Sequence, residues 1–251
     1  PYVDGVWELP KHSGFFGLVK LISELRKENY DLIYDAHSNL RSFFVRWGLG
    51  LFTSNTIVKR PKSRWRRFLL FSMRVNTFQW PFRGMYSFLK PLQQKKILNW
   101  EEGDDLTQTL KLGSDVSREP MKARVSVDRP YLALAPSAAW PMKRWPLRHW
   151  KYFVQIFVKQ FPCIPIYILG GPQDDFCEEI AAEAENAINL AGKLSLLGSC
   201  EVIRHAQLVI SADTGLIHVA DLMGVDGISL MGPTAFGFPS NPQIQVASID
   251  L

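Results

Sequence analysis

Val209-Ile-Ser-Ala-Asp-Thr-Gly-Leu-Ile-His-Val-Ala220 is the stretch that decides the fold. Its apolar run predicts a buried β-strand that ends at Asp213, and Thr214-Gly215 predicts a tight turn that leads directly into a helix. The first N–H groups of such a helix lack partners within it, and the helix dipole is positive at that end. The turn can therefore bind an anion such as the diphosphate of a substrate, with His218 one helical turn further along the same face. An ordinary strand–turn–helix with a packed histidine is the alternative that this stretch alone leaves open.

The second half of the chain repeats this pattern. Short apolar strands alternate with amphipathic helices, which predicts an α/β fold with a doubly wound parallel sheet. We expect strands at 131–135, 164–169, 187–190, 208–212, 227–231 and 244–249, and helices at 147–160, 196–205 and 216–223 among others. Ligands of such sheets bind at the carboxyl ends of the strands. The polar residues that follow these strands are Ser137, Lys143, Gly171, Asp174, Asp213, Thr214 and Thr234.

The first half is less regular. Its periodicity predicts helices over 15–28, 39–48, 63–75 and 83–92, with short strands at 31–35 and 56–58. Residues 101–127 are polar and irregular, so we place a linker near 112–129. The sequence therefore predicts two domains, one at 1–122 and one at 123–251.

Charge is distributed unevenly along the chain. No residue between Asp35 and Glu101 is acidic, whereas this span carries thirteen Lys or Arg residues, mixed with large aromatic side chains. Such a mixture suits an anionic membrane surface or a phosphorylated, lipid-linked substrate, and it also suits nucleic acid. A solvated basic helix face is the plainer alternative. The length of the acid-free span favours an anionic partner over a merely solvated face, and the candidate residues for an acceptor or membrane surface are Arg60, Arg64, Arg66 and Arg67.

Other features of the sequence exclude several classes of protein. No apolar run reaches the ~18 residues of a membrane helix, and Pro1-Tyr-Val-Asp-Gly lacks the basic start and the apolar core of a signal peptide, so we expect neither. Cys163, Cys177 and Cys200 are unevenly spaced, so we expect buried thiols in a reducing, cytoplasmic compartment. The chain contains no dinucleotide-binding or P-loop glycine pattern, no metal-ligand spacing and no G-x-S-x-G turn. We expect neither a metal nor a cofactor.

Four ordered motifs resemble those of one known family. They are Ala135-Pro-Ser-Ala-Ala-Trp-Pro-Met-Lys-Arg-Trp-Pro146 with Trp150, Leu169-Gly-Gly-Pro172 with Asp174, Asp213-Thr-Gly-Leu216 with His218, and Met231-Gly-Pro-Thr234. Together they resemble glycosyltransferase family nine, the bacterial heptosyltransferases of the lipopolysaccharide core. Tyr30-Asp-Leu-Ile-Tyr-Asp35, followed by Asn39, Arg41 and Ser42, is similar to the motif of that family's first domain.

The resemblance implies a GT-B architecture, in which two Rossmann-like domains face each other and the second holds the donor. It also implies inverting, metal-independent transfer from an ADP-activated heptose to a lipid-linked saccharide. The reaction would take place in the cytoplasm of a Gram-negative bacterium, at the inner face of the cytoplasmic membrane, where the enzyme would be peripheral.

The roles of individual residues follow from the same resemblance. Lys143 resembles the lysine that meets the donor phosphates, and Asp174 the acidic residue that holds the ribose. Asp213 resembles the carboxylate near the donor sugar, while Thr214 and Gly215 resemble the diphosphate-binding turn. Ser137 belongs to the same site, and His218 matches a helix histidine whose role stays open. Plainer alternatives remain, namely a surface lysine at Lys143 and a helix N-cap at Asp174. We expect Trp145 and Trp150 to pack the following helix.

Chemistry supports these assignments independently. Cleavage of a sugar–diphosphate bond places negative charge on the leaving phosphate. Without a metal, a fixed cation such as Lys143 and a helix N-terminus must stabilise that charge.

The beginning of the chain departs from the family pattern. The glycine-rich loop whose aspartate serves as general base is absent from this sequence, so we expect the first domain to be incomplete. The C-terminal end of the family pattern is absent as well. Asp35 is a weak candidate for the base, because a loop amide or Arg41 would explain it equally well. A catalytically silent relative that binds a nucleotide-sugar or an anionic glycolipid is therefore the alternative function.

Overall fold

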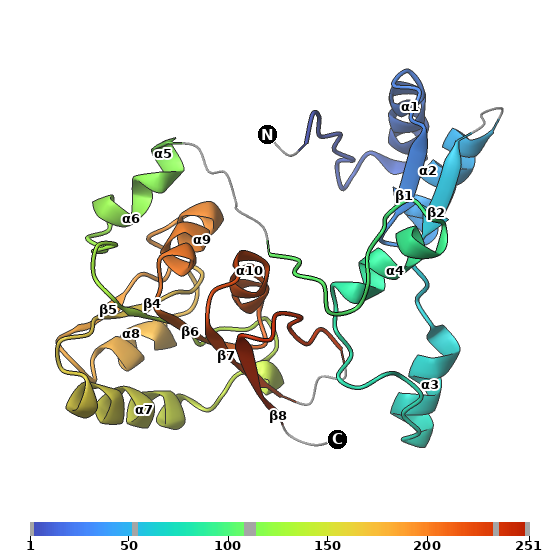
Figure 1. Ribbon diagram of the computed structural model, residues 1–251. Coiled ribbons are helices and arrows are strands. Elements are labelled where there is room, and N and C mark those ends of the chain that lie inside the picture. Colours follow the sequence, from blue (N-terminus) through green and yellow to red (C-terminus); the bar gives the residue numbers. More distant parts are fainter. Residues whose placement is uncertain (1–2, 52–54, 108–113, 233–235, 249–251) are drawn as a thin grey trace. The chain divides into compact units, whose positions relative to one another are not determined.

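The computed structural model describes residues 3–51, 55–107, 114–232 and 236–248 (Figure 1). The chain forms two compact units. The first comprises Pro1–Trp80 and Met85–Gly103, and the second comprises Pro81–Gly84 and Asp104–Leu251. The short segment Pro81–Gly84 thus belongs to the second unit, although the chain on both sides of it belongs to the first.

The first unit contains four helices and two parallel strands among its described residues. In chain order they are α1 (Gly14–Arg26), β1 (Leu32–Asp35), α2 (Leu40–Gly50), β2 (Thr56–Lys59), α3 (Arg64–Met73) and α4 (Tyr86–Gln94). β1 pairs with β2 in parallel, so that Asp35 lies opposite Lys59 at the carboxyl ends of the strands. The predicted helices and strands of this region are confirmed to within a few residues.

Side chains fix the positions of α1 and α2. The Arg26 guanidinium donates from Nε and Nη2 to the carbonyl oxygen of Gly48, at 2.9 and 2.6 Å. A cation is favourable at this point because the carbonyl end of a helix carries partial negative charge. Gly48 must be small, since a Cβ there would lie 2.7 Å from Ile22 Cγ2.

The helix predicted over 83–92 begins later, at Tyr86. The residues before it use their backbone groups in a different way. Phe82 accepts hydrogen bonds from the N–H groups of Gly237 and Phe238, both at 3.1 Å, and the Gly84 N–H donates to the Phe238 carbonyl at 3.3 Å. These pairings replace the hydrogen bonds of a helical turn.

The second unit is built on a six-stranded sheet. Its elements are α5 (Ser114–Ser117), α6 (Glu119–Lys122), β3 (Leu132–Ala135), the 3₁₀ turn η1 (Pro141–Lys143), α7 (Leu147–Gln160), β4 (Ile166–Ile168), α8 (Phe176–Ala181), β5 (Ala187–Asn189), α9 (Leu196–Arg204), β6 (Leu208–Ala212), α10 (Gly215–Met223), β7 (Gly227–Met231) and β8 (Ile244–Ser248). The strand order is β5-β4-β3-β6-β7-β8, and every pair is parallel. The predicted doubly wound parallel sheet is confirmed.

Alternating side chains of the strands form one core on each face of this sheet. Tyr131 and Ala133 belong to a cluster with residues of α9 and α10, whereas Leu132 and Leu134 belong to a cluster with residues of α7 and α8. Figure 1 shows α7 and α8 on one side of the sheet, and α9 and α10 on the other. Trp150 is fully buried in the second cluster and makes an edge contact with Trp145, which confirms the packing role expected for these tryptophans.

The division between the units falls after Gly103, whereas the sequence places the domain boundary after residue 122. The region between includes α5 and α6, which the irregular sequence did not predict. Glu119 joins α6 to the start of α9, because its carboxylate accepts from the N–H and the hydroxyl of Ser195, each at 2.9 Å. The helices α5 and α6 therefore belong to the second unit.

Cys177 and Cys200 are buried, as expected, but the expectation was wrong for Cys163, which is exposed in the turn after α7. Within the described ranges, every helix is too short or too polar to cross a bilayer.

Candidate functional site

The turn between β6 and α10 presents an open helix N-terminus. β6 is buried almost throughout, and Asp213, directly after it, is 7% exposed. Thr214 is the N-cap of α10, with an extended backbone and a side chain that makes no capping hydrogen bond. Its hydroxyl and the first N–H groups of the helix are therefore left for a ligand.

Gly215, the first residue of α10, leaves space in front of this N-terminus. A Cβ added at Gly215 would meet no atom within 4 Å. The glycine is thus required neither by backbone strain nor by packing inside the protein. Its small size instead lets a ligand approach the backbone closely.

Lys143 lies at the same place. Its Nζ is 2.8 Å from Asp213 Oδ2, and the side chains are 31% and 6% exposed, respectively. A carboxylate this deeply buried needs a cation, and the pairing holds the lysine in a fixed position. An ammonium group has three donors, so Lys143 keeps donors for an incoming anion while it contacts Asp213.

The sheet topology explains why these residues meet. β3 and β6 are neighbours, and the chain continues from β3 toward β4 on one side and from β6 toward β7 on the other. Lys143 follows β3 and Asp213 follows β6, so both lie at the point where the strand order reverses. Open parallel sheets bind ligands at such points.

The glycine turn after β4 borders the same edge of the sheet. Asp174 Oδ2 accepts a hydrogen bond from the Gly171 N–H at 2.7 Å. The N-cap of α8 is Asp175, so the alternative role of Asp174 as that N-cap was wrong. The carboxylate of Asp174 instead stabilises the turn that precedes the helix.

His218 is half-buried on α10, next to the loop that follows β7. Gly237 of that loop has a φ of +91°, which favours glycine, and a Cβ there would lie 4.0 Å from His218 Nε2. His218 therefore lies in the first turn of α10 and close to this loop. The histidine thus lies near the predicted anion-binding turn, and it also packs beside the loop at Gly237.

Asp221, one turn beyond His218, anchors the same loop. Its Oδ1 accepts hydrogen bonds from the N–H groups of Ser240 and Asn241, at 2.8 and 2.6 Å. The Arg83 guanidinium donates to the Ser240 carbonyl oxygen at 2.9 Å. Burial raises the pKa of the Asp221 carboxyl, while the two backbone donors and the nearby His218 and Arg83 partly oppose that rise.

Ser137 and Thr234 are the other two polar residues that were predicted at this edge of the sheet. Ser137 follows β3 and is half-buried. Thr234 lies outside the described residues.

Asp35 belongs to the first unit and is buried at the end of β1. Its Oδ1 accepts from the Ser38 N–H at 2.7 Å, and its Oδ2 accepts from the Ser42 hydroxyl at 3.0 Å. The loop-amide explanation therefore accounts for one oxygen and a helix hydroxyl for the other. Both oxygens hold the loop and the start of α2 in place, which is a poor arrangement for a general base.

The four arginines of the predicted basic surface have different surroundings. The Arg60 guanidinium stacks 3.8 Å above the Phe88 ring, and burial lowers its pKa. Arg66 donates to the Thr77 hydroxyl at 3.2 Å and lies over the Phe78 ring. Arg64 lines a pocket with Asp35, whereas Arg67 is exposed on α3. They do not form one uniform patch.

Among the described residues, no three His, Cys, Asp or Glu side chains gather closely enough to hold a metal ion.

The sequence interpretation overlooked several residues of these sites. Asp221 is one, because its importance depends on a loop that lies nineteen and twenty residues away in the chain. Arg46 and Lys59, which line the pocket next to Asp35, are others. Helical spacing could have indicated Arg46, since Asn39, Phe43 and Arg46 share one face of α2.

Comparison with known proteins shows which sequences and structures are similar to this chain. The model of "Glycosyltransferase family 9 (heptosyltransferase)" matches residues 18–248. Lipooligosaccharide heptosyltransferase 2 of Haemophilus influenzae is 26% identical over 251 residues, which cover 94% of this chain and 70% of that protein. Lipopolysaccharide heptosyltransferase 1 of Pseudomonas aeruginosa is 28% identical over 109 residues, or 43% of this chain and 30% of that protein.

Solved structures show the same fold. The E. coli ADP-heptose lps heptosyltransferase II superposes with a TM-score of 0.68 at 20% identity, covering 92% of this chain and 72% of that one. A Veillonella parvula protein of the same family gives a TM-score of 0.74 at 18% identity, with coverages of 96% and 70%. The architecture is therefore that of GT-B glycosyltransferases.

Proposed function

Because this chain belongs to glycosyltransferase family 9, we propose that it transfers a heptose-like sugar from an ADP-sugar to a lipopolysaccharide-core acceptor, with inversion and without a metal. The observation that carries the proposal is the Lys143–Asp213 pair beside the open N-terminus of α10. The names of the relatives support the heptose and the lipooligosaccharide acceptor.

In this proposal the donor diphosphate lies against the α10 N-terminus. The N–H groups of the first turn and the Thr214 hydroxyl donate to phosphate oxygens, and the space in front of Gly215 admits them. Lys143 adds a full positive charge that Asp213 holds in position. Cleavage of the sugar–phosphate bond increases the negative charge on the leaving diphosphate, and fixed donors of this kind stabilise that charge without reorganisation.

The remaining donor contacts follow from the neighbouring loops. One oxygen of Asp174 is engaged by Gly171, and the other can accept from a ribose hydroxyl. The loop that Asp221 anchors lies beside His218, where the donor sugar would be held. Donor recognition would thus involve loops after β3, β4, β6 and β7.

A transfer assay tests the proposal. The product of the full-length gene is offered ADP-heptose and other nucleotide-sugars in parallel with a lipopolysaccharide-core acceptor, and product formation is followed by mass spectrometry. Transfer from ADP-heptose in preference to the others is expected. Binding of the nucleotide-sugar without transfer would instead support the silent-relative alternative.

Substitution of Gly215 tests the donor site separately from the fold. Gly215→Val should lower the affinity for ADP at least tenfold in calorimetric titration, because the new side chain occupies the space proposed for the phosphates. Its thermal midpoint without ligand should stay within about 2 °C of the parent, since the space is empty in the protein. Ala182→Val, at an exposed position of the same unit, should leave ADP affinity unchanged. Unchanged affinity in the Gly215 variant would argue against a diphosphate at this turn.

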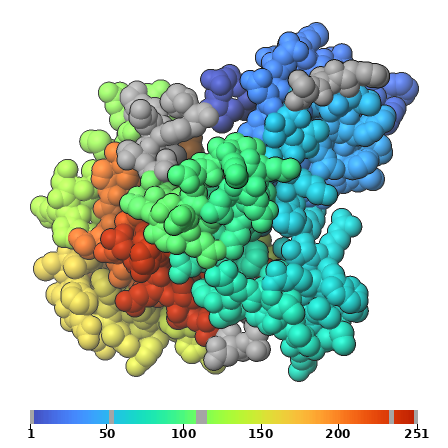
Figure 2. Space-filling model, turned by 45° about the vertical axis from the view of Figure 1, so that its right-hand side comes forward, coloured from blue at the N-terminus to red at the C-terminus, as the bar shows by residue number. Residues whose placement is uncertain are grey.

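We further propose that α3 contacts the anionic membrane surface at which a lipid-linked acceptor is found. None of its described residues is buried, and Trp65 and Phe71 are 69% and 65% exposed next to Arg66 and Arg67. Figure 2 shows α3, in turquoise, at the surface of the molecule. Aromatic rings among arginines are typical of helices that lie in the headgroup region of anionic membranes.

Vesicle binding tests the role of α3. Arg66→Glu with Arg67→Glu should weaken binding to vesicles of mixed anionic and zwitterionic lipid at least tenfold in a sedimentation assay, because each basic residue near such a surface contributes about 1 kcal/mol. Lys159→Glu with Lys193→Glu produces the same change in net charge within the second unit. An equal loss in both double variants would show that net charge alone, and not α3, governs binding.

A further inference from the structure

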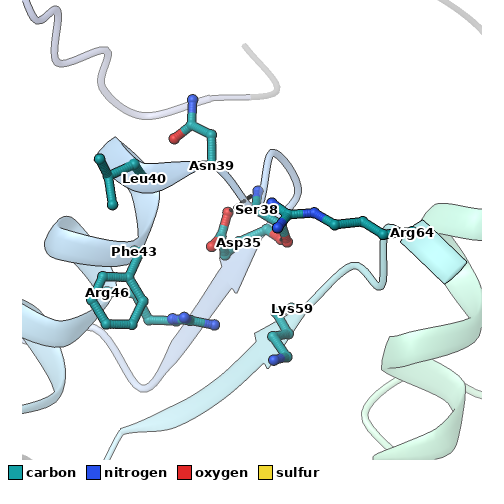
Figure 3. A pocket seen from close by; sticks show the side chains of 8 residues that line it. All are labelled: Asp35, Ser38, Asn39, Leu40, Phe43, Arg46, Lys59 and Arg64. Carbon is teal, nitrogen blue, oxygen red and sulfur yellow. Dashed lines mark hydrogen bonds between the residues drawn. The ribbon is translucent and has the colours of Figure 1, made fainter.

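A pocket of about 270 Å³ in the first unit lies at the carboxyl ends of β1 and β2, next to the start of α2 (Figure 3). Its charged lining residues are Asp35, Arg46, Lys59 and Arg64, so three cations face one carboxylate. This volume is slightly below the roughly 300–1,000 Å³ of pockets for drug-sized ligands, and it suits a phosphate group with part of the molecule that carries it.

The single carboxylate does not neutralise these cations through direct ion pairs. Asp35 is buried, and its oxygens accept from the Ser38 N–H and the Ser42 hydroxyl. Within the described ranges, no carboxylate lies within 4.0 Å of the charged nitrogens of Arg46, Lys59 or Arg64. The pocket therefore retains an excess of positive charge and free donors.

The floor of the pocket is rigid before any ligand arrives. Ser38 has a positive φ of 49°, and its hydroxyl donates to the Arg60 carbonyl oxygen at 2.7 Å, which ties the loop after β1 to the end of β2. The capping box of Asn39 and Ser42 fixes the first turn of α2 at the rim. Figure 3 shows the Arg46 and Arg64 side chains extending toward the same space from opposite sides.

From this geometry we propose that the pocket binds the dianion of a phosphate monoester. Two guanidinium groups offer paired donors that match phosphate oxygens, and Lys59 and the positive end of α2 add to the attraction. The site is separate from the donor site of the second unit, because all of its lining residues belong to the first unit. The assignment of this phosphate to a phosphorylated saccharide acceptor rests on the proposed function.

Titration calorimetry at low ionic strength tests the site with inorganic phosphate, methyl phosphate, methyl sulfate and glucose 6-phosphate. Methyl phosphate should bind at least tenfold more tightly than methyl sulfate, because it carries a second negative charge at neutral pH. Arg46→Gln with Lys59→Gln should weaken methyl phosphate binding at least tenfold. Arg41→Gln with Lys62→Gln, which removes the same number of charges from exposed residues of the same unit, should have little effect.

The outcomes separate this site from the donor site. If glucose 6-phosphate binds more tightly than inorganic phosphate, the phosphate of a sugar is the ligand. If the two bind equally, the sugar adds nothing, and free phosphate is sufficient to occupy the pocket. Equal weakening by both double variants, or no binding to the parent protein, overturns the inference. Lys143→Ala should leave methyl phosphate binding intact while it affects ADP, so either site can fail without the other.

Discussion

ADP at about one hundred times its dissociation constant should raise the thermal midpoint of this protein by about 5–10 °C, and Lys143→Ala should abolish the rise. A ligand at that concentration stabilises the folded state by about 2.7 kcal/mol, and a unit of this size gains about 2–4 °C for each kcal/mol. Lys143 is the only lysine or arginine paired with Asp213 among the described residues, at the turn that the diphosphate would contact. Differential scanning fluorimetry with and without ADP measures the effect.

Loss of Lys143 should also destabilise the free protein, and the same measurement must distinguish this effect from the loss of ADP binding. Without its cation, Asp213 keeps a buried charge, so the free variant should be less stable by about 1–3 kcal/mol. Lys143→Met with Asp213→Asn removes both charges and should recover much of that stability without recovering the ADP response. Lys159→Ala, on the exposed end of α7, should behave like the parent. A normal ADP shift in the Lys143 variants would refute the donor-site assignment.

Asp221→Ala should destabilise the protein by about 2–4 kcal/mol in chemical denaturation. The substitution leaves the N–H groups of Ser240 and Asn241 without their acceptor, and each buried unpaired donor costs about 1–3 kcal/mol. It also frees the loop beside His218, so ADP-sugar binding should weaken more than ADP binding. Equal weakening of the two would contradict a role for this loop at the sugar.

Asp221→Asn provides the matched control, because an amide oxygen can accept the same two hydrogen bonds. Burial raises the pKa of Asp221 above that of an unfolded chain, so the folded state favours the protonated carboxyl. Its contribution to stability is complete below the unfolded pKa and is lost as the pH rises through the folded pKa. The asparagine variant should therefore gain stability relative to the parent on going from pH 4 to pH 7. A constant difference over that range would show that Asp221 does not titrate in this way.

The sequence predicted the parallel sheet of the second unit from its local pattern. Its strands are short, apolar and regularly spaced, so the periodicity and the parallel order follow from local patterns and known crossover rules. Lys143, Asp213, Thr214 and Gly215 could be predicted to lie at one edge of the sheet because all four come in the segments that follow β3 and β6. Their 2.8 Å ion pair could not, since it depends on how the turn η1 folds back over the sheet edge.

Other features depend on contacts that a single sequence does not display. The apparently irregular region before β3 forms two short helices because Glu119 and α9 provide partners. In the sequence, Asp221 looks like any acidic residue on a helix, because its hydrogen bond from the distant Ser240 appears only in the structure. Likewise, the basic span suggested one surface for an anionic partner, but it divides into the stacked Arg60, the pocket residues Arg46, Lys59 and Arg64, and the exposed arginines of α3.

The segment Pro81–Gly84 bears on how this protein can be dissected. Its backbone supplies hydrogen bonds to Gly237 and Phe238, and Arg83 supplies one to Ser240, so it serves as part of the second unit's own structure. A fragment that begins at Asp104 would omit these partners, although it would contain every strand of the large sheet. The second unit is therefore not continuous in the sequence, and a fragment that keeps these hydrogen bonds must include residues 81–84.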